Sequence, residues 1–468
     1  MKRSLKTALP WHMTPVIFAL AWPTMLEELM QTAVQYVDTA MVGAIGTQAT
    51  AAVGATSTIN WLVTCTISAV GVGFLAFVAQ AFGSEDTDRA KRASAQAVLA
   101  VLFCGVLFTA LPLSLAGVVP VWMQVDPAIQ ELASQYFFVL YSPMLFRSAM
   151  IIFGVVLKAV GETKLPMKVG LMVNGINIVL NCLLIFPSGS IDLFGLTIPT
   201  YGAGLGAVGA AIASAIAFSC GGIRMTIAFF RHPMISPRGY SFKPDFSILK
   251  PCFKVAAPNI LQRFGTCLGY VAFAAMINSL GEVATAAHTI ANTVESAFYV
   301  PGYGMQTASA TLAGNALGAR DYRRIRDLSR MILVIEFCLM IVTGGLLFLF
   351  APNMMRLFSR DLEVILLGSV VLRMVAVSEP FYGVSIIVEG MMQGMGKTMM
   401  PFLCNLLGMW GVRIVGTFIC TQLLGMGLVA AWGCMIFHNV LLFVMFYYYY
   451  RTGKWLPRDV RGEVLGRV

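Results

Sequence analysis

Charged residues are scarce in this chain. Asp, Glu, Lys and Arg make up 12% of its 468 residues, whereas 58% are hydrophobic, and the mean hydropathy is +0.79. Soluble domains usually contain about 25% charged residues, so a chain with so little charge cannot cover a large water-exposed surface. The composition therefore excludes an ordinary water-soluble protein and indicates one that is embedded in a membrane.

Residues that build catalytic and metal centres are also few. The four histidines lie far apart in the sequence, and no HExxH motif or Gly-rich phosphate loop followed by Lys-Ser/Thr is present. The ten cysteines form no CxxC pair, which argues against a zinc site and a disulfide framework. We expect no catalytic residues and no cofactor, so a membrane enzyme is disfavoured.

What the chain does contain is a series of apolar runs. About 20 residues are enough to cross the hydrocarbon core of a bilayer, and the separators here are charged or rich in Gly and Pro. We expect an all-α polytopic membrane protein with twelve transmembrane helices, at 14–40, 50–79, 93–117, 132–157, 165–187, 203–230, 247–277, 284–315, 329–351, 362–392, 400–424 and 427–450.

Lys and Arg concentrate in alternate loops and at both chain ends. The richest loops are 89–92, 158–168, 231–250 and 320–330, and the opposite loops contain only two basic residues. Basic loops stay in the cytoplasm, so we expect a multi-pass protein of the cell (inner) membrane with both termini cytoplasmic. The net charge of +10 comes from these dispersed loops, and we expect no nucleic-acid partner.

The two halves of the chain resemble each other at a constant offset of 235 residues. The shift aligns Pro23 with Pro258, GSEDTDRAKRAS (83–94) with GARDYRRIRDLS (318–329), and GETKLP (161–166) with GKTMMP (396–401). Each repeat has an even number of helices, so both repeats have the same orientation in the membrane. Many secondary transporters contain such parallel repeats and bind their substrate near the membrane midplane. We expect an N-terminal six-helix lobe (1–230), a cytoplasmic linker (231–250), a C-terminal six-helix lobe (251–450) and a basic cytoplasmic tail (451–468).

The first predicted helix carries acids within MLEELMQTAVQYVDTAMVG (25–43). Glu27, Gln31, Gln35 and Asp38 share one face at helical spacing. A charge at the centre of a transmembrane helix costs about 2.5–3.5 kcal/mol on insertion scales, so these groups should face protein or water. Burial favours the protonated form of a carboxyl group, which would let these acids exchange protons. The alternative is that they neutralise fixed basic residues.

Other predicted helices carry polar faces that would line a substrate cavity. The matching face of the seventh helix keeps polar side chains but lacks the acids, so the cation site should belong to the N-terminal lobe. Asn174, Asn177 and Asn181 share a face of the fifth helix, where interhelical hydrogen bonding is the alternative role. The remaining cavity candidates are Asn60, Gln262, Arg263, Tyr270, His288, Asn292, Glu295, Tyr299 and Glu389.

Two of these cavity candidates have a structural alternative. His288 also fits a hydrogen-bonded structural role. Glu295 also fits an ion pair with Arg263 of the neighbouring helix. Both alternatives stay open at the level of the sequence.

These sequences resemble the multidrug and toxic compound extrusion (MATE) family. The similar pieces are LEELMQTAVQYVDTAMVG, AVGETKLP, AAHTIANTVESAFYVPGYG, GNALGARD and GMGKTMMP, and together with the twelve-helix pattern they cover essentially the whole chain. The resemblance implies a V-shaped transporter of two six-helix lobes. It also implies export of organic cations by alternating access, in exchange for protons or sodium.

The resemblance further implies which residues couple the cation. Asp38 matches the first-helix acid of the family's VDT motif, which takes part in coupling in several members. Asn177 and Asn181 fall where some members place an Asn and a second Asp, so Asn181 departs from that pattern. The expected coupling group is Asp38, Glu27, Asn177 and Asn181. Protons are favoured, with Na⁺ near Asp38 as the alternative; a C-lobe sodium site would need Glu295 or Glu389.

The alternative function is a lipid or lipid-linked oligosaccharide flippase of a related transporter family. Intramembrane Arg147, Arg263, Arg373 and Arg413 would bind pyrophosphate head groups if they lined the cavity. Arginines that instead neutralise acids inside a lobe would argue against it. The expected partners are cationic amphiphilic small molecules and the lipid bilayer, and we expect a monomer.

Overall fold

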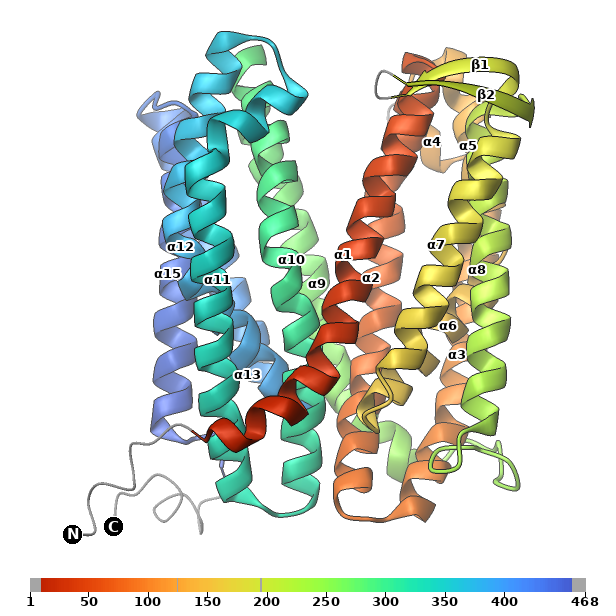
Figure 1. Cartoon of the computed structure of the whole chain (residues 1–468), viewed down its shortest axis with the longest axis vertical. Coiled ribbons are helices and arrows are strands. Elements are labelled where there is room, and N and C mark those ends of the chain that lie inside the picture. The colour runs from red at the N-terminus through yellow and green to blue at the C-terminus, as the bar shows by residue number, and fades with distance from the viewer. Residues whose placement is uncertain (1–9, 124, 194–195, 457–468) are drawn as a thin grey trace. The chain divides into compact units, whose positions relative to one another are not determined.

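The structure is a computed structural model that describes residues 10–123, 125–193 and 196–456. Helices dominate this part of the chain (Figure 1). The long helices are α1 (Thr14–Gly43), α2 (Thr47–Gly83), α3 (Thr87–Leu115), α5 (Gln130–Tyr141), α6 (Met144–Ala159), α7 (Lys164–Leu184), α8 (Gly206–Arg231), α9 (Phe246–Asn278), α10 (Glu282–Gly318), α11 (Tyr322–Phe358), α12 (Leu362–Gly394) and α15 (Leu428–Thr452). Shorter pieces are η2 (Trp11–Met13), α4 (Val119–Trp122), η3 (Pro127–Ile129), α13 (Met399–Leu406), α14 (Val415–Phe418) and the π-helical segments η4 (Leu407–Ile414) and η5 (Ile419–Leu423).

The described helices account for the predicted membrane spans. Nine are long and apolar enough to cross a membrane, counting α13 to η5 as one. A tenth span is η3 with α5 and α6, which bend by 49° at Pro143, a residue that cannot donate a helical hydrogen bond. The remaining two, α1 and α10, have 30 and 37 residues and carry the polar side chains that lower their hydropathy. The twelve-helix, all-α prediction is confirmed.

A β-hairpin joins α7 to α8, and the sequence patterns did not predict it. Strands β1 (Pro187–Leu193) and β2 (Leu196–Ala203) are antiparallel, with Ile191 opposite Ile198. The chain then enters α8 through Gly204 and Gly206, whose φ angles of +67° and +57° favour glycine. The hairpin caps the end of the helix pair (Figure 1).

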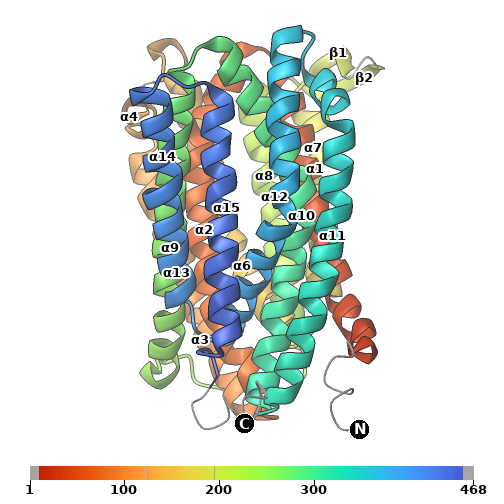
Figure 2. The same ribbon diagram turned by 90° about the vertical axis from the view of Figure 1, so that its left-hand side faces the viewer.

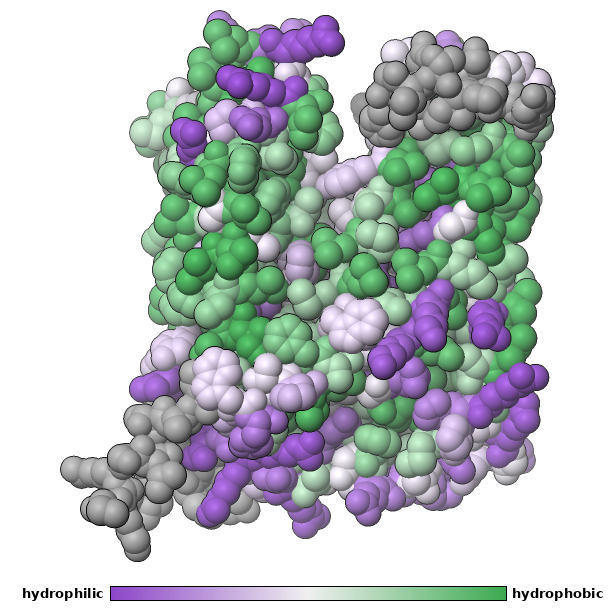
Figure 3. Space-filling model, viewed as in Figure 1, coloured by the Kyte–Doolittle hydropathy of each residue, from purple (hydrophilic) through white to green (hydrophobic). Residues whose placement is uncertain are grey.

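The described residues pack into two compact units. Unit 1 comprises 10–26, 79–85 and 254–456; unit 2 comprises the described parts of 27–78 and 86–253. The units differ from the predicted lobes in three places. The first part of α1 and the end of α2 belong with the C-terminal helices, and residues 251–253 of α9 belong to unit 2. In each unit, the face in Figure 3 is hydrophobic along the helices and hydrophilic at the lower end. In unit 2 that end carries the first turns of α3, which contain Arg89, Lys91 and Arg92.

The first part of α1 belongs to unit 1 because it packs into that unit's core. Ile17 and Ala21 are fully buried in the cluster that contains Met305 and Met331. Thr24 donates a hydrogen bond from Oγ1 to the carbonyl oxygen of Gly304 on α10, at 2.8 Å. The rest of this unit comprises the end of α2 and the helices from α9, beginning at Lys254, to α15 (Figure 2).

The internal repeat is visible where α2 ends against α10 within unit 1. Gly83 lies directly against the backbone of Asn315, and Gly318 lies directly against the backbone of Gln80. The two glycines are related by the 235-residue offset, and so are their two neighbours. Neither glycine leaves room for a Cβ, so the close approach of the two helix ends requires glycine in both repeats.

In unit 2, small residues bring the helices together in the same way. Gly222 of α8 faces the carbonyl oxygen of Phe146 on α6, and a Cβ there would clash with that oxygen. Close backbone approach at small residues is typical of packing between transmembrane helices. By contrast, Gly175 of α7 has nothing within 4 Å of an added Cβ.

We expect Gly222→Ala to destabilise the protein. The added methyl group overpacks the α6–α8 contact, which typically costs about 1–3 kcal/mol. The matched control is Gly175→Ala, which should be neutral or slightly stabilising because alanine favours the helix. Thermal unfolding of the purified protein measures both changes. Equal transition temperatures for the two variants would contradict the close contact at Gly222.

Candidate functional site

A carboxylate and two amides meet inside unit 2. Asn181 of α7 donates hydrogen bonds from Nδ2 to Oδ1 of Asp38 on α1, at 2.7 Å, and to Oδ1 of Asn177, at 3.0 Å. Asn177 in turn donates to Oγ of Ser214 on α8, at 3.0 Å. Asn177 and Asn181 are buried, and Asp38 is half-buried. Three of the four expected coupling residues therefore lie together; Ser214 was not predicted.

The spacing on α7 explains this arrangement. Asn177 and Asn181 are four residues apart, so they stack on the face that packs against α8. Their amide groups remain inside the bundle because a buried polar group is costly without a hydrogen-bond partner. The result is a polar contact that links three helices of unit 2 and holds one oxygen of Asp38.

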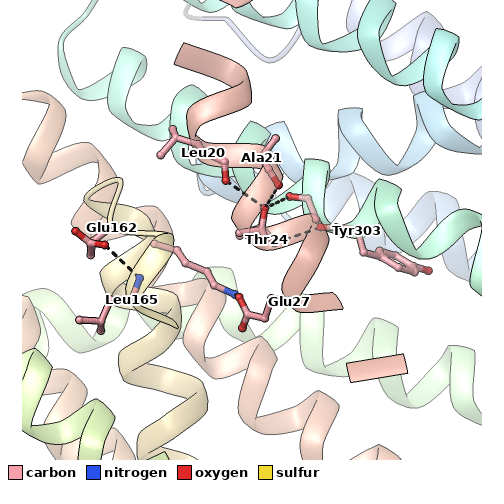
Figure 4. Close-up of polar contacts among 10 residues, drawn as sticks. Leu20, Ala21, Thr24, Glu27, Glu162, Leu165 and Tyr303 are labelled. Atoms are coloured by element: carbon pink, nitrogen blue, oxygen red, sulfur yellow. Dashed lines mark hydrogen bonds and ion pairs between the residues drawn. The ribbon is translucent and has the colours of Figure 1, made fainter. Parts of the chain in front are cut away.

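Glu27, the fourth expected coupling residue, forms an ion pair. Its Oε2 lies 2.8 Å from Nζ of Lys158 on α6 (Figure 4). The Lys158 side chain is 9% exposed and that of Glu27 is 22% exposed. Gly170 of α7 lies beside the pair; a Cβ there would make an ordinary van der Waals contact with Cγ of Glu27, at 3.6 Å. The geometry matches the alternative role of Glu27, which is to neutralise a basic residue.

The repeat-related positions in unit 1 also meet, but without a basic residue. They are Gln262 of α9 and Gln393 of α12, and both donate to Oε1 of Glu389, at 2.9 and 3.0 Å. Asn405 of α13 donates to Oε2 of the same carboxylate, at 3.2 Å. Glu389, which was expected to line the substrate cavity, is thus surrounded by three amide donors.

Arg147 of α6 contacts polar and aromatic side chains within unit 2. It donates to Oδ1 of Asn60 at 2.6 Å and to Oγ1 of Thr64 at 2.8 Å, both on α2. Its guanidinium carbon lies 4.6 Å from the ring centroid of Phe218, a cation–π geometry. Tyr136 lies within electrostatic range of both Arg147 and Asp38. The side-chain oxygen of Asn60, an expected cavity residue, is therefore held by Arg147.

The other polar residues expected on unit 2 make fewer contacts. Gln31 and Gln35 are exposed on α1, and Asn174 is half-buried one turn before Asn177. Their contribution to a substrate cavity stays a prediction.

Unit 1 encloses a polar cavity of about 60 Å³. This volume suits a few water molecules and is far below the roughly 300–1,000 Å³ of a drug-binding pocket. Four expected cavity residues line it: Tyr270, Asn292, Glu295 and Tyr299. The rest of the lining is Thr266, Tyr382, Asn405, Met409, Arg413, Met435, His438, Asn439 and Leu442.

The charge of Arg413 dominates this cavity. The residue is 3% exposed, and its guanidinium carbon lies 4.2 Å from the ring centroid of Phe273 and 5.0 Å from that of Tyr270. It acts electrostatically on Glu295 and on His438. Arg413 thus neighbours an acid inside the unit. Sequence patterns missed His438 as a lining residue because it lies on the last helix, far from α10 in the chain.

The contacts of His288 match the structural role that was considered for it. Its Nδ1 accepts a hydrogen bond from Nε1 of Trp432, at 3.3 Å. Its ring also makes edge-to-face contacts with Trp432 and Phe273, at centroid distances of 5.8 and 5.5 Å. His288 is not among the residues that line the cavity.

Comparison with known proteins relates this arrangement to a transporter family. The family model MatE matches residues 23–183 and again residues 258–419. The chain belongs to the MatE family. The two matched segments begin 235 residues apart, which is the offset of the internal repeat found in the sequence.

Among curated proteins, two relatives of this MatE chain carry the same name. One is "Probable multidrug resistance protein NorM" of Thermotoga maritima, 26% identical over 98% of both chains. The other, from Neisseria meningitidis serogroup B, is 23% identical over 90% of both chains. The solved structure of MATE in complex with MaL6 has a TM-score of 0.86 at 21% identity and covers 97% of both chains.

A further solved structure shows the same fold. It is the outward-facing conformation of a multidrug resistance MATE family transporter of the MOP superfamily, with a TM-score of 0.86 at 21% identity; it covers 97% of this chain and 96% of its own. This MatE protein is therefore a multi-pass membrane transporter with the two-repeat, twelve-helix fold.

We expect that replacing Glu27 and Lys158 together destabilises the protein less than replacing either residue alone. Glu27→Gln leaves the buried charge of Lys158 without its partner, which typically costs about 3–5 kcal/mol; Lys158→Gln leaves the half-buried Glu27 carboxylate without its partner and should cost less. The double variant recreates the pair of glutamines found in the second repeat and should be more stable than either single variant. Thermal unfolding of all four proteins measures the coupling. Additive losses would contradict a paired role for Glu27.

Proposed function

We propose that this MatE transporter exports cationic amphiphilic small molecules in exchange for protons, with Asp38 as the coupling carboxylate. The observation that carries the proposal is the contact of Asp38 with Asn181, which places one acid among amides inside a membrane-spanning unit. The names of the NorM relatives, which refer to multidrug resistance, support the substrate class.

The exchange follows from charge balance at Asp38. As a carboxylate, Asp38 attracts a cationic substrate; once protonated, it is neutral and that attraction is lost. A proton taken up from outside therefore releases the cation outside, and proton loss to the cytoplasm restores cation binding. Such a cycle requires that proton and substrate differ in affinity for the two states of the transporter.

We assign coupling to Asp38 and a structural role to Glu27. Glu27 already has a cation, Lys158, at 2.8 Å, so its negative charge is balanced without substrate. Asn177 and Asn181 position Asp38 through the hydrogen bonds described above. We favour a proton over Na⁺, since binding a proton requires a single carboxylate oxygen, whereas Na⁺ requires several oxygen ligands at once.

The contacts of two of the arginines favour drug export over the flippase. Arg147 is hydrogen-bonded to Asn60 and Thr64, and Arg413 neighbours Glu295 in a cavity too small for a lipid head group. Phosphate recognition requires basic groups that are available to the ligand. We also place both termini in the cytoplasm of the cell membrane, as the basic loops indicate.

The test is efflux of ethidium from proteoliposomes under an imposed proton gradient, without sodium and then with it. We expect the parent protein to export ethidium when only protons are supplied. Asp38→Asn should abolish proton-driven export, because the amide cannot bind and release the proton. The matched control is Glu131→Gln, which changes an exposed acid of the same unit and should leave export unchanged.

Other outcomes would redirect the proposal. Export by the parent that follows sodium alone would contradict proton coupling. Export that survives in Asp38→Asn would remove Asp38 from the coupling site. No ethidium export under either gradient would make lipid flipping the next function to measure.

A further inference from the structure

Glu336 of α11 lies in a pocket between three helices of unit 1. It is fully buried. A Cβ on Gly302 of α10 would lie 2.6 Å from its Oε1, and a Cβ on Gly383 of α12 would lie 3.2 Å from the same atom. A Cβ at either position would also lie within 2.6 Å of the Met340 side chain. The two glycines therefore let the carboxyl group of Glu336 and the side chain of Met340 pack closely against α10 and α12.

Glu379 of α12 lies one turn before Gly383 and is 1% exposed. It interacts electrostatically with Glu336 and with Glu295 of α10. None of the four carboxylate oxygens of Glu336 and Glu379 has a hydrogen-bond partner within the described residues. The salt bridges found in that part of the chain involve neither acid. A Cβ on Gly344 of α11 would lie 3.4 Å from Cβ of Glu379, so both buried acids lie where α11 packs against α12, and no cation is bonded to either one within the described residues.

The elements that pack against α11 and α12 or line the cavity carry charged and titratable groups. They include Glu295, Tyr299 and Tyr303 on α10, Tyr382 and the exposed Arg373 on α12, the exposed His12 on η2, Arg413 on η4 and His438 on α15. The Arg373 guanidinium lies over the ring of Phe348, and no cation among these groups is bonded to Glu336 or Glu379 within the described residues. The charge of Arg413 interacts electrostatically with Glu295, but not with Glu336 or Glu379.

Two adjacent carboxylates cannot both stay ionised without a counter-ion in a medium of low polarity. An acid within a membrane domain is by default a functional site. We propose that Glu336 and Glu379 form a second proton-binding site in unit 1, which holds a proton in this conformation and exchanges it during transport. This second site is separate from Asp38, which lies in the other unit. The inference rests on the proposed function only in its claim that the proton is released during transport.

Tyr299, which lines the cavity, lies within electrostatic range of Glu379. The hydroxyl oxygens of Tyr303 and Tyr382 are 3.1 Å apart, and the ring of Tyr299 makes edge contacts with both, at centroid distances of 5.8 Å. Tyr299, Tyr382 and Glu295 line the cavity. On release, the carboxylic O–H bond breaks, the carboxylate remains, and the proton passes by way of hydroxyl groups to water in the cavity. On uptake the same steps run in reverse.

The first measurement is the infrared C=O stretch of protonated carboxylic acids, recorded on the purified full-length protein in H₂O and D₂O across pH. We expect the parent to show this band and to lose it as pH rises. Glu336→Gln and Glu379→Gln should each weaken the band, and the double variant should weaken it further. The matched control is Glu282→Gln, an exposed acid at the start of α10, which should match the parent.

The second measurement counts protons released into weakly buffered solution when ethidium is added. We expect the parent to release more protons per bound ethidium than Glu336→Gln or Glu379→Gln. A band in the double variant equal to that of the parent would show that the pair is ionised and overturn the proposal. A band that never changes with pH, or equal proton release from parent and variants, would show a permanently protonated pair and overturn it as well.

These readouts separate the two proposals. The infrared band needs no transport, so it can support the Glu336–Glu379 site even if Asp38→Asn exports ethidium normally. Conversely, loss of export in Asp38→Asn with an unaltered band in the double variant would keep the proposed function and remove the second site. Using both single variants keeps the test decisive if one of them fails to fold.

Discussion

A polar group inside the hydrocarbon core is costly unless it finds a partner within the protein, and this constraint shapes much of the structure. Water is absent there, so an unpaired charge or amide costs several kcal/mol. Unit 2 meets the constraint with an ion pair between Glu27 and Lys158 and with the contacts of Arg147 to Asn60 and Thr64. Each contact joins helices that are distant in sequence, so the polar groups specify which helix faces meet.

The two repeats use one backbone framework for different chemistry. The positions of Glu27 and Lys158 in the first repeat become Gln262 and Gln393 in the second, where both donate to Glu389. The helix–helix contact is kept while its charges are exchanged for amides. Duplicated helices can therefore diverge in electrostatics without loss of packing, and the two units need not perform the same step of transport.

Much of the fold could be predicted because lipid imposes simple patterns. Length and apolarity indicated the twelve spans, and a constant offset indicated the repeat. One face of the first helix pointed to Asp38, and the spacing of Asn177 and Asn181 placed both on one face of another. The hairpin at 187–203 was missed, because its strands carry no clear alternation. The membership of residues 10–26 in unit 1 was missed too, because it depends on packing against α10.

By itself, the sequence determined that the first-helix acids must face protein or water, since lipid cannot solvate them. Only the tertiary structure decided that Glu27 meets Lys158 while Asp38 meets an amide. It likewise decided that Glu295 neighbours Arg413. The reason is that helical periodicity specifies only the face on which a side chain lies. The partner across that face depends on how each helix is rotated and packed against helices far away in the chain.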